Sequence, residues 1–206
     1  MLRIWGRLSS INVRKVVLAA QWLGVPFERI DAGAGFGIVS TPDFRAKNPN
    51  AMVPLVEDDG FTLWESNVIV RYLCAKHASA CLYPTGLVER FDAERWMDWQ
   101  QTTLNPAGRE AFIQLVRVPA DKRSDAAIAR SVAQTEPLLD MLEAQLASQR
   151  HMAGEQFGMA DIPIACEIHR WFALPLQHRP RPALENWYRE ILGRPAARGV
   201  LDLPLS

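Results

Sequence analysis

The feature that most constrains this chain is that strand-like patterns occur only in its first 80 residues. There, short apolar runs alternate with amphipathic segments in the order β-α-β-α-β-β-α. After the sequence Tyr-Pro-Thr-Gly at 83–86, apolar residues recur only at helical spacing. The predicted fold class is therefore α/β plus all-α, with a first domain over residues 1–79 and an all-helical second domain over 87–206.

The first domain combines a crossover unit with a terminal hairpin. Its expected elements are a strand at 2–5, a helix from Asn12 to Gly24, a strand at 26–31, a short helix near 42–46, a hairpin at 53–63 and a helix over 65–78. In the last helix we expect Val68, Tyr72 and Ala75 to share the apolar face, with the Ser66 hydroxyl as N-cap.

The second domain reads as four helices joined by proline-bearing loops. The expected helices span residues 88–116, 128–146, 159–174 and 182–192. Pro106 is expected to kink the first of them, because proline removes a backbone hydrogen bond from a helix. Pro137 lies inside the second.

Composition and charge exclude several classes of protein. The chain of 206 residues is 49% hydrophobic and 22% charged, which is ordinary for a globular protein. Its 23 basic residues balance 23 acidic ones, so no overall positive field attracts nucleic acid or an anionic membrane. Cys74, Cys81 and Cys166 lack metal-binding spacing and suit a reducing compartment. Without a signal-peptide pattern or an apolar run of membrane length, we expect a cytoplasmic protein with no metal.

Four motifs, in this order, resemble the cytosolic glutathione S-transferases. They are LSSINVRKV, NPNAMVPLVEDDGFTLWESNVIVRYL, FGMADIPIAC and ALENWYREILGRPAARG. The resemblance, closest to serine-type bacterial members with theta-, zeta- and nu-like features, implies a thioredoxin-like first domain. It also implies a homodimeric detoxification enzyme that conjugates glutathione, as co-substrate, to a small hydrophobic electrophile without a cofactor.

The resemblance assigns the glutathione site to two segments. It implies a cis bond before Pro54, so that the N–H and C=O of Val53 pair with the cysteinyl backbone of glutathione; an ordinary trans loop proline is the alternative. It also implies that Glu65 and Ser66 hold the γ-glutamyl end at a helix N-terminus, where a plain N-cap is the alternative. Ala51 and Met52 depart from the family pattern, so a cation for the glycyl carboxylate must come from elsewhere.

The catalytic candidates lie between the first strand and the first helix. Because no tyrosine or cysteine precedes Tyr72, Ser9, Ser10 and Asn12 are the available groups to hold the glutathione sulfur. Ser9 matches the serine of theta-, zeta- and delta-like members, and we rank it ahead of Asn12. Ser10 and Asn12 match a Thr-Pro-Asn pattern of members active on glutathione disulfides, so Ser10 is expected to contact glutathione. Alternatively, Ser10 or Asn12 caps the helix.

A helix of the second domain is expected to form the wall of the second-substrate pocket. By resemblance, the wall residues are Trp99, Thr103 and Phe112, with Trp96 and Thr102 beside them. Aromatic residues at this spacing are also typical of a core.

Two glycine motifs have simpler interpretations. The loop at 33–37 lacks the G-x-G-x-x-G spacing of a dinucleotide site and is interpreted as a connector. Gly158 and Asp161 occupy the positions of a capping box and are expected to serve folding.

Two other functions remain open from the sequence. A glutathione-dependent disulfide or peroxide reductase would explain the Ser10-Ile11-Asn12 pattern. A non-catalytic binding module is compatible with the same fold, because a fold does not determine a function.

Overall fold

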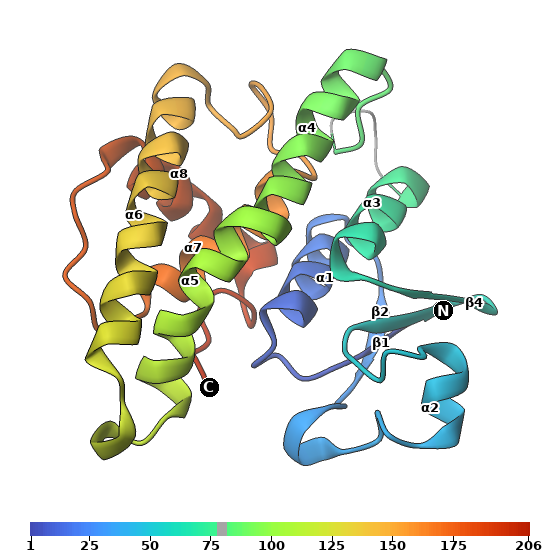
Figure 1. Ribbon diagram of the computed structural model, residues 1–206. Coiled ribbons are helices and arrows are strands. Elements are labelled where there is room, and N and C mark those ends of the chain that lie inside the picture. Colours follow the sequence, from blue (N-terminus) through green and yellow to red (C-terminus); the bar gives the residue numbers. More distant parts are fainter. Residues whose placement is uncertain (78–81) are drawn as a thin grey trace.

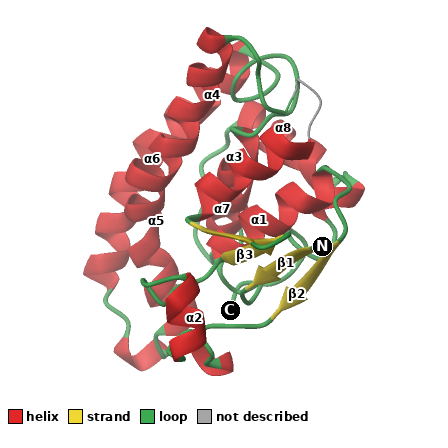
Figure 2. Cartoon of the chain, turned by 90° about the vertical axis from the view of Figure 1, so that its right-hand side faces the viewer, coloured by secondary structure: helices red, strands yellow, loops and turns green. Residues whose placement is uncertain are grey.

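A four-stranded sheet forms the centre of the first half of the chain (Figures 1 and 2). The computed structural model describes residues 1–77 and 82–206, so Cys81 and part of the expected domain boundary lie outside the described residues. The strands are β1 (Leu2–Trp5), β2 (Phe27–Ile30), β3 (Leu55–Asp58) and β4 (Phe61–Trp64). In the order β2-β1-β3-β4, β1 runs parallel to β2 and antiparallel to β3, and β3 pairs antiparallel with β4. The predicted order of elements is confirmed.

The helices cover the two faces of this sheet unequally. Helices α1 (Ile11–Trp22) and α3 (Ser66–His77) lie on the face toward the second half of the chain, whereas the short α2 (Pro42–Lys47) lies on the other (Figure 1). Along β1, Ile4 belongs to the main core, while Trp5 contacts Phe44 of α2 edge-on. Successive side chains of a strand point to opposite faces, so a four-residue strand supplies both layers.

Helix α1 ends at the glycine that the sequence predicts. Gly24 has a φ of +66°, its N–H donates to Gln21, and the N–H of Val25 donates to Ala20. These two bonds form a Schellman motif, which satisfies carbonyls at the end of the helix.

The prediction of which face of α3 packs against the core is wrong. Val68 and Ala75 are exposed and Tyr72 is half-buried, whereas Ile69, Val70 and Leu73 are buried. Apolar residues occur on both sides of this helix, so periodicity alone does not decide which side faces the core. Contacts with α1 decide it, and an apolar surface remains on the outside.

The second half begins with one long helical rod whose hydrogen bonding changes along its length. It comprises α4 (Leu87–Trp99), the π-helical segment η2 (Gln100–Leu104), α5 (Asn105–Phe112) and the π-helical segment η3 (Ile113–Arg117). Pro106 lacks the N–H that an α-helix would direct at residue 102. The widened turn of η2 directly precedes Pro106, so the rod changes its winding there and continues.

The remaining helices are α6 (Asp125–Ser148), which contains Pro137, α7 (Asp161–Phe172) and α8 (Pro182–Leu192). Single 3-10 turns occur at η1 (Ala34–Phe36), η4 (Ala120–Lys122) and η5 (Pro195–Ala197).

At the start of α7, Asp161 accepts the N–H of Gly158 at 2.9 Å and the indole N–H of Trp187 at 2.9 Å. Asp161 is completely buried, so the structure supports the expected folding role of this motif.

The described residues set two bounds on function. Within 1–77 and 82–206, no helix has the length and apolar character needed to cross a membrane. The same ranges contain no cluster of three or more histidine, cysteine or acidic residues that could hold a metal.

A buried arginine–histidine pair ties the end of the chain to α1. Arg14 donates to His169 of α7 at 2.7 Å, to the carbonyl of Val200 at 2.6 Å and to that of Pro204 at 2.8 Å. Because Arg14 is a cation, the Nε2 atom of His169 accepts and the ring is neutral. Burial, together with the charge of Arg14, lowers the pKa of His169 from 6.5 to about 4.

This pKa predicts a loss of stability in acid that depends on His169. The unfolded chain binds a proton at this site below about pH 6.5, whereas the folded chain resists protonation until about pH 4. The stability present above pH 6.5 should therefore fall by about 3 kcal/mol between pH 6.5 and pH 4. We expect His169→Gln to remove this part of the pH dependence in urea unfolding, and His77→Gln, which removes an exposed histidine, to retain it. If the free energy of unfolding falls equally with decreasing pH in His169→Gln and in the parent, the prediction is contradicted.

Candidate active site

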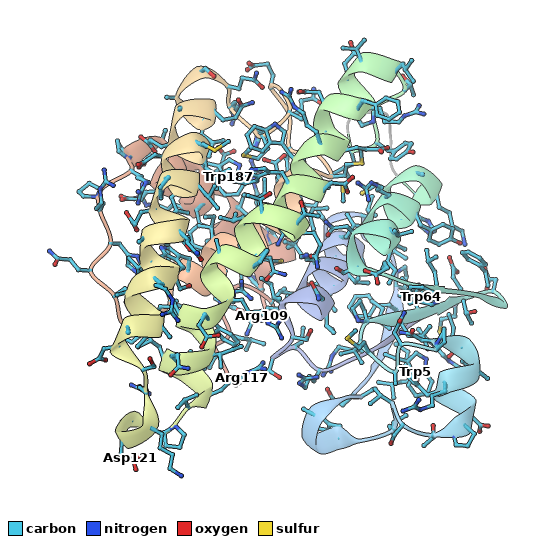
Figure 3. All side chains as sticks on the ribbon, viewed as in Figure 1. Trp5, Trp64, Arg109, Arg117, Asp121 and Trp187 are labelled. Carbon is cyan, nitrogen blue, oxygen red and sulfur yellow. The ribbon has the colours of Figure 1, made fainter. Side chains whose placement is uncertain are left out.

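A pocket of about 580 Å³ lies between the two halves of the molecule (Figure 3). One wall comes from the loop after β1, the start of α1, the segment before β3 and the start of α3. The rod α4–η3 supplies the opposite wall, and Leu205 near the end of the chain also contributes. All seven residues expected to be catalytic or to bind glutathione line the pocket, namely Ser9, Ser10, Asn12, Val53, Pro54, Glu65 and Ser66.

The N-terminus of α1 opens into this pocket with unsatisfied donors. Ser10 is the N-cap residue, but its side chain forms no capping hydrogen bond. In the described chain, the backbone N–H groups of Ile11 and Asn12 have no hydrogen-bond partner, and the first turn contains no acidic residue. Free N–H groups and the helix dipole make this end favourable for an anion.

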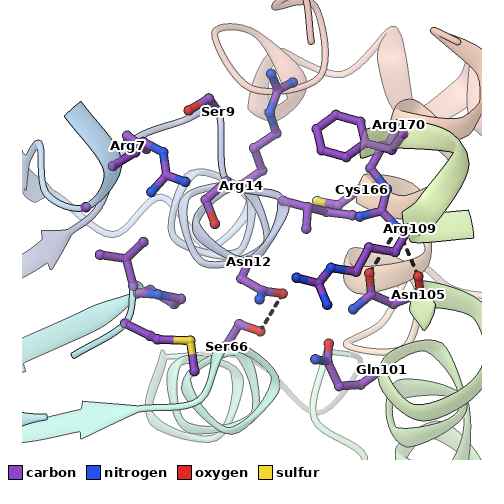
Figure 4. A pocket seen from close by; sticks show the side chains of 18 of the residues that line it. Arg7, Ser9, Asn12, Arg14, Ser66, Gln101, Asn105, Arg109, Cys166 and Arg170 are labelled. Carbon is purple, nitrogen blue, oxygen red and sulfur yellow. Dashed lines mark hydrogen bonds between the residues drawn. The ribbon is translucent and has the colours of Figure 1, made fainter. Parts of the chain in front are cut away.

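Asn12 and Ser66 meet across the start of two helices. The hydroxyl of Ser66, the first residue of α3, donates to Oδ1 of Asn12 at 3.2 Å (Figure 4). The expectation that this hydroxyl caps α3 is therefore wrong, since Ser66 is already the first helical residue and the backbone carbonyl of Glu65 before it accepts the N–H of Ile69. With Oδ1 engaged, the amide NH₂ of Asn12 remains as a donor. Figure 4 shows Ser9 apart from this pair, beside Arg7.

The segment before β3 exposes backbone groups to the pocket. The Val53–Pro54 bond is cis, as expected, and both residues line the pocket. Among the described residues, neither the N–H nor the C=O of Val53 has a hydrogen-bond partner. Nearby, Glu65 has a φ of +74°, a conformation that residues other than glycine rarely adopt and that is often found at functional sites.

The wall formed by the rod is a stripe at four-residue spacing. Its members are Gln101, Asn105, Arg109, Ile113 and Arg117. In a regular α-helix each four-residue step turns the side chain by about 40°, so the stripe would rotate by about 160° over its length. The π-helical segments η2 and η3 have wider turns, which offset this rotation and keep the stripe toward the pocket.

Only one of the three expected wall residues lines the pocket, and it lies beside the stripe. Phe112 lines the pocket, whereas Trp99 and Thr103 are not among the lining residues. Trp99 contacts the buried Trp96 edge-on at 5.3 Å, and Thr103 is exposed. Both residues are two positions away from Gln101, which places them on other faces of the rod. Thr102, for its part, bonds back to the carbonyl of Asp98.

None of the five arginines that line the pocket was expected from the sequence, and three of them have neither a carboxylate partner nor a side-chain hydrogen bond among the described residues. Arg7 comes from the loop after β1, and Arg109 and Arg117 come from the rod, where they point toward the first domain (Figure 3). The signal was present, because both rod arginines repeat at the spacing of the stripe. A strict repeat of four residues drifts around a regular α-helix, so α-helical periodicity does not place these residues on one face.

A buried polar network supports the stripe from behind. Lys15 of α1 is 0% exposed and donates to Gln100 and Gln101 at 2.8 Å each. Gln100 donates to Glu167 of α7 at 2.8 Å, and Glu167 also pairs with Arg170. Burial lowers the pKa of Lys15 to about 8.

From that network, Arg170 donates to Oδ1 of Asn105 at 2.9 Å (Figure 4). Two stripe residues are thus held from behind by this network. Cys166 also borders the pocket, but burial raises the pKa of its thiol to about 12, so it remains protonated.

Comparison with known proteins gives the same family for the first and the second half of the chain. Residues 1–75 match the family model described as glutathione S-transferase, N-terminal domain, and residues 125–190 match glutathione S-transferase, C-terminal domain. The chain is 43% identical over 208 residues to glutathione S-transferase GstB of Escherichia coli strain K12, with 100% of both chains covered. It is also 32% identical to glutathione S-transferase 3 of Zea mays, covering 99% of this chain and 95% of that protein.

A solved structure shows the same likeness in three dimensions. The theta class glutathione S-transferase from Xanthomonas axonopodis pv. citri, with glutathione bound, is 41% identical and superposes with a TM-score of 0.96. The match covers 100% of this chain and 99% of that one.

Proposed function

The chain belongs to the glutathione S-transferase family, and from that premise we propose how its pocket binds glutathione and transfers it to an electrophile. The observation that carries the proposal is the convergence on one wall of the unpaired Val53 backbone, the N-termini of α1 and α3, and the Asn12–Ser66 pair. These groups match the parts of glutathione: a peptide backbone, an α-carboxylate and a thiol.

Each end of the tripeptide has a complementary group. The free N–H and C=O of Val53 suit the cysteinyl backbone, which would add to this edge as a short strand. The free backbone N–H groups at the N-terminus of α3 suit the γ-glutamyl carboxylate, while the single O–H of Ser66 orients Asn12, and Glu65 suits the ammonium group. Arg7, near Val53, is the nearest candidate on this wall for the glycyl carboxylate that Ala51 and Met52 do not serve.

We further propose that Asn12, rather than Ser9, is the main side chain that holds the glutathione sulfur. Its amide is oriented by Ser66, so its NH₂ group is available as a donor, and it belongs to the positive end of α1. Within the described residues no hydrogen bond orients the Ser9 side chain, which lies beside Arg7 (Figure 4). A free thiol with a pKa near 8.5 is only about 3% thiolate at pH 7, so donors to the sulfur increase the reactive fraction.

The pH–rate profile of three alanine variants tests this order. Loss of one hydrogen bond to a charged sulfur, worth roughly 1.5–3 kcal/mol, raises the thiol pKa by about one to two units. We expect Asn12→Ala to lower kcat/KM about tenfold at pH 7 and less at pH 9, where solvent ionises the thiol. Ser9→Ala and Ser10→Ala serve as matched variants and should stay within about twofold of the parent. If only Ser9→Ala shifts the profile upward, the ranking from the sequence is right and Asn12 is not the sulfur ligand.

Ser66→Ala should weaken glutathione binding without destabilising the fold comparably. The hydroxyl does not cap α3, so its removal costs little of the cap energy, but it removes the hydrogen bond that orients the Asn12 amide toward the sulfur. The bond from Asn12 to the charged sulfur is worth roughly 1.5–3 kcal/mol, so with that bond lost we expect about a tenfold rise in the calorimetric dissociation constant for glutathione. Ser148→Ala, at an exposed hydroxyl of α6, is the control. An unchanged constant would exclude Ser66 from the site.

The cellular setting and assembly belong to the same proposal. We propose a cytoplasmic enzyme that detoxifies electrophiles and works as a homodimer. Support for the dimer comes from exposed apolar side chains on adjacent outer faces of β4, α3 and α4, namely Phe61, Trp64, Val68, Leu87, Val88 and Phe91. Arg71 of α3 pairs with Asp98 of α4, so the two helices are neighbours. Exposed apolar side chains gathered on neighbouring elements mark interaction sites.

Light scattering at micromolar concentration tests the dimer. We expect a mass of twice the chain mass of 23.2 kDa, and a shift toward the monomer for Phe91→Asp. Phe36→Asp, which changes an exposed phenylalanine of η1, should leave the mass unchanged. A parent protein that scatters as a single chain would contradict the proposal.

A further inference from the structure

Arginines without carboxylate partners gather at the side of the pocket away from the proposed glutathione wall. Arg109 and Arg117 project from the rod, one on each side of Ile113 along the stripe. Among the described residues, no carboxylate lies within salt-bridge distance of either guanidinium, nor of Arg7 across the pocket. Like charges held together without a counter-charge repel one another, so the arrangement favours an anion between them.

The positive charge is local to this pocket. The whole chain carries a formal net charge of +0, with 23 basic and 23 acidic residues. Yet the pocket is lined by five arginines and a single carboxylate, that of Glu65. Glu65 belongs to the first-domain wall beside Ser66, so it does not neutralise the arginines of the rod.

Packing against Phe112 positions one of these arginines, Arg117. The guanidinium of Arg117 lies 4.9 Å from the ring centroid of Phe112, and that of Arg170 lies 5.4 Å from the same ring. Arg170 is committed to Glu167 and Asn105, whereas Arg117 keeps its donors free. Burial, and then the charges of Arg7, Arg170 and Arg109, lower the pKa of Arg117. The other three cations therefore lie close enough to Arg117 to disfavour its charge.

We propose that the second substrate is a small electrophile that carries a carboxylate next to its reacting carbon, and that Arg109 and Arg117 bind this carboxylate. The inference rests on the proposed transferase function and narrows its substrate class. Guanidinium groups match a carboxylate because their fixed N–H donors can form paired, charge-assisted hydrogen bonds. Phe112 and Ile113 supply an apolar surface for the small carbon skeleton.

The arginines contribute to the reaction through electrostatics. In a substitution, the glutathione thiolate forms the new S–C bond while the bond from carbon to the leaving group breaks, and the leaving group departs with the electron pair. The proton of the thiol has already passed to solvent when the thiolate forms. A carboxylate beside the carbon repels the incoming thiolate, and two guanidinium groups on that carboxylate offset the repulsion.

The experiment compares two substrates of nearly equal shape, iodoacetate and iodoacetamide. We measure kcat/KM for each by iodide release at saturating glutathione, and the KM for glutathione separately. For Arg109→Gln/Arg117→Gln we expect the ratio of kcat/KM for iodoacetate to that for iodoacetamide to fall at least tenfold. The KM for glutathione should stay within about twofold of the parent. Arg130→Gln, which removes an exposed arginine of α6 outside the pocket, should leave the ratio unchanged.

Other results would overturn the inference in distinguishable ways. An unchanged ratio with a raised KM for glutathione would assign these arginines to a carboxylate of glutathione instead. A parent enzyme that converts iodoacetamide but not iodoacetate would retain the transferase function and exclude a carboxylate electrophile. If neither probe nor 1-chloro-2,4-dinitrobenzene is conjugated, the transferase function fails as well.

Discussion

The buried contact between Lys15 and the rod is the interaction on which the pocket depends. One wall of the pocket belongs to the first domain and the other to the helical half, so its shape exists only while the two halves keep one relative position. A lysine that is 0% exposed requires polar partners, and it finds them in Gln100 and Gln101. Through Gln100 it reaches Glu167 of α7. The cost of leaving these groups unpaired specifies how the halves dock.

The winding of the rod determines which side chains reach the pocket. A regular α-helix would rotate Arg117 away from the face that carries Gln101, and two π-helical turns offset that rotation. The change in winding at Pro106 therefore has a functional result as well as a local cause. The change in winding next to Pro106 keeps the polar and cationic residues of the stripe on one face along the rod.

The two walls offer the ligands proposed for them different means of recognition. The first domain offers backbone groups and helix N-termini, whose positions are set by the fold itself and which suit a peptide such as glutathione. The rod offers long side chains, Arg109 and Arg117, whose charge is not balanced nearby. The proposed anionic second substrate and a thiolate would repel each other in water. The cations on the rod and the positive end of α1 would offset that repulsion in the pocket.

The sequence by itself determined the order of elements, the end of α1 at Gly24, the residues of the first-domain wall and the family, because these depend on local patterns and short motifs. Tertiary structure decided which face of α3 is buried, that Ser66 bonds to Asn12, and that Arg109 and Arg117 line the pocket while Trp99 and Thr103 do not. Those outcomes depend on how a helix is rotated against its neighbours. When apolar residues occupy two sides of a helix, or when its winding departs from 3.6 residues per turn, only packing selects that rotation.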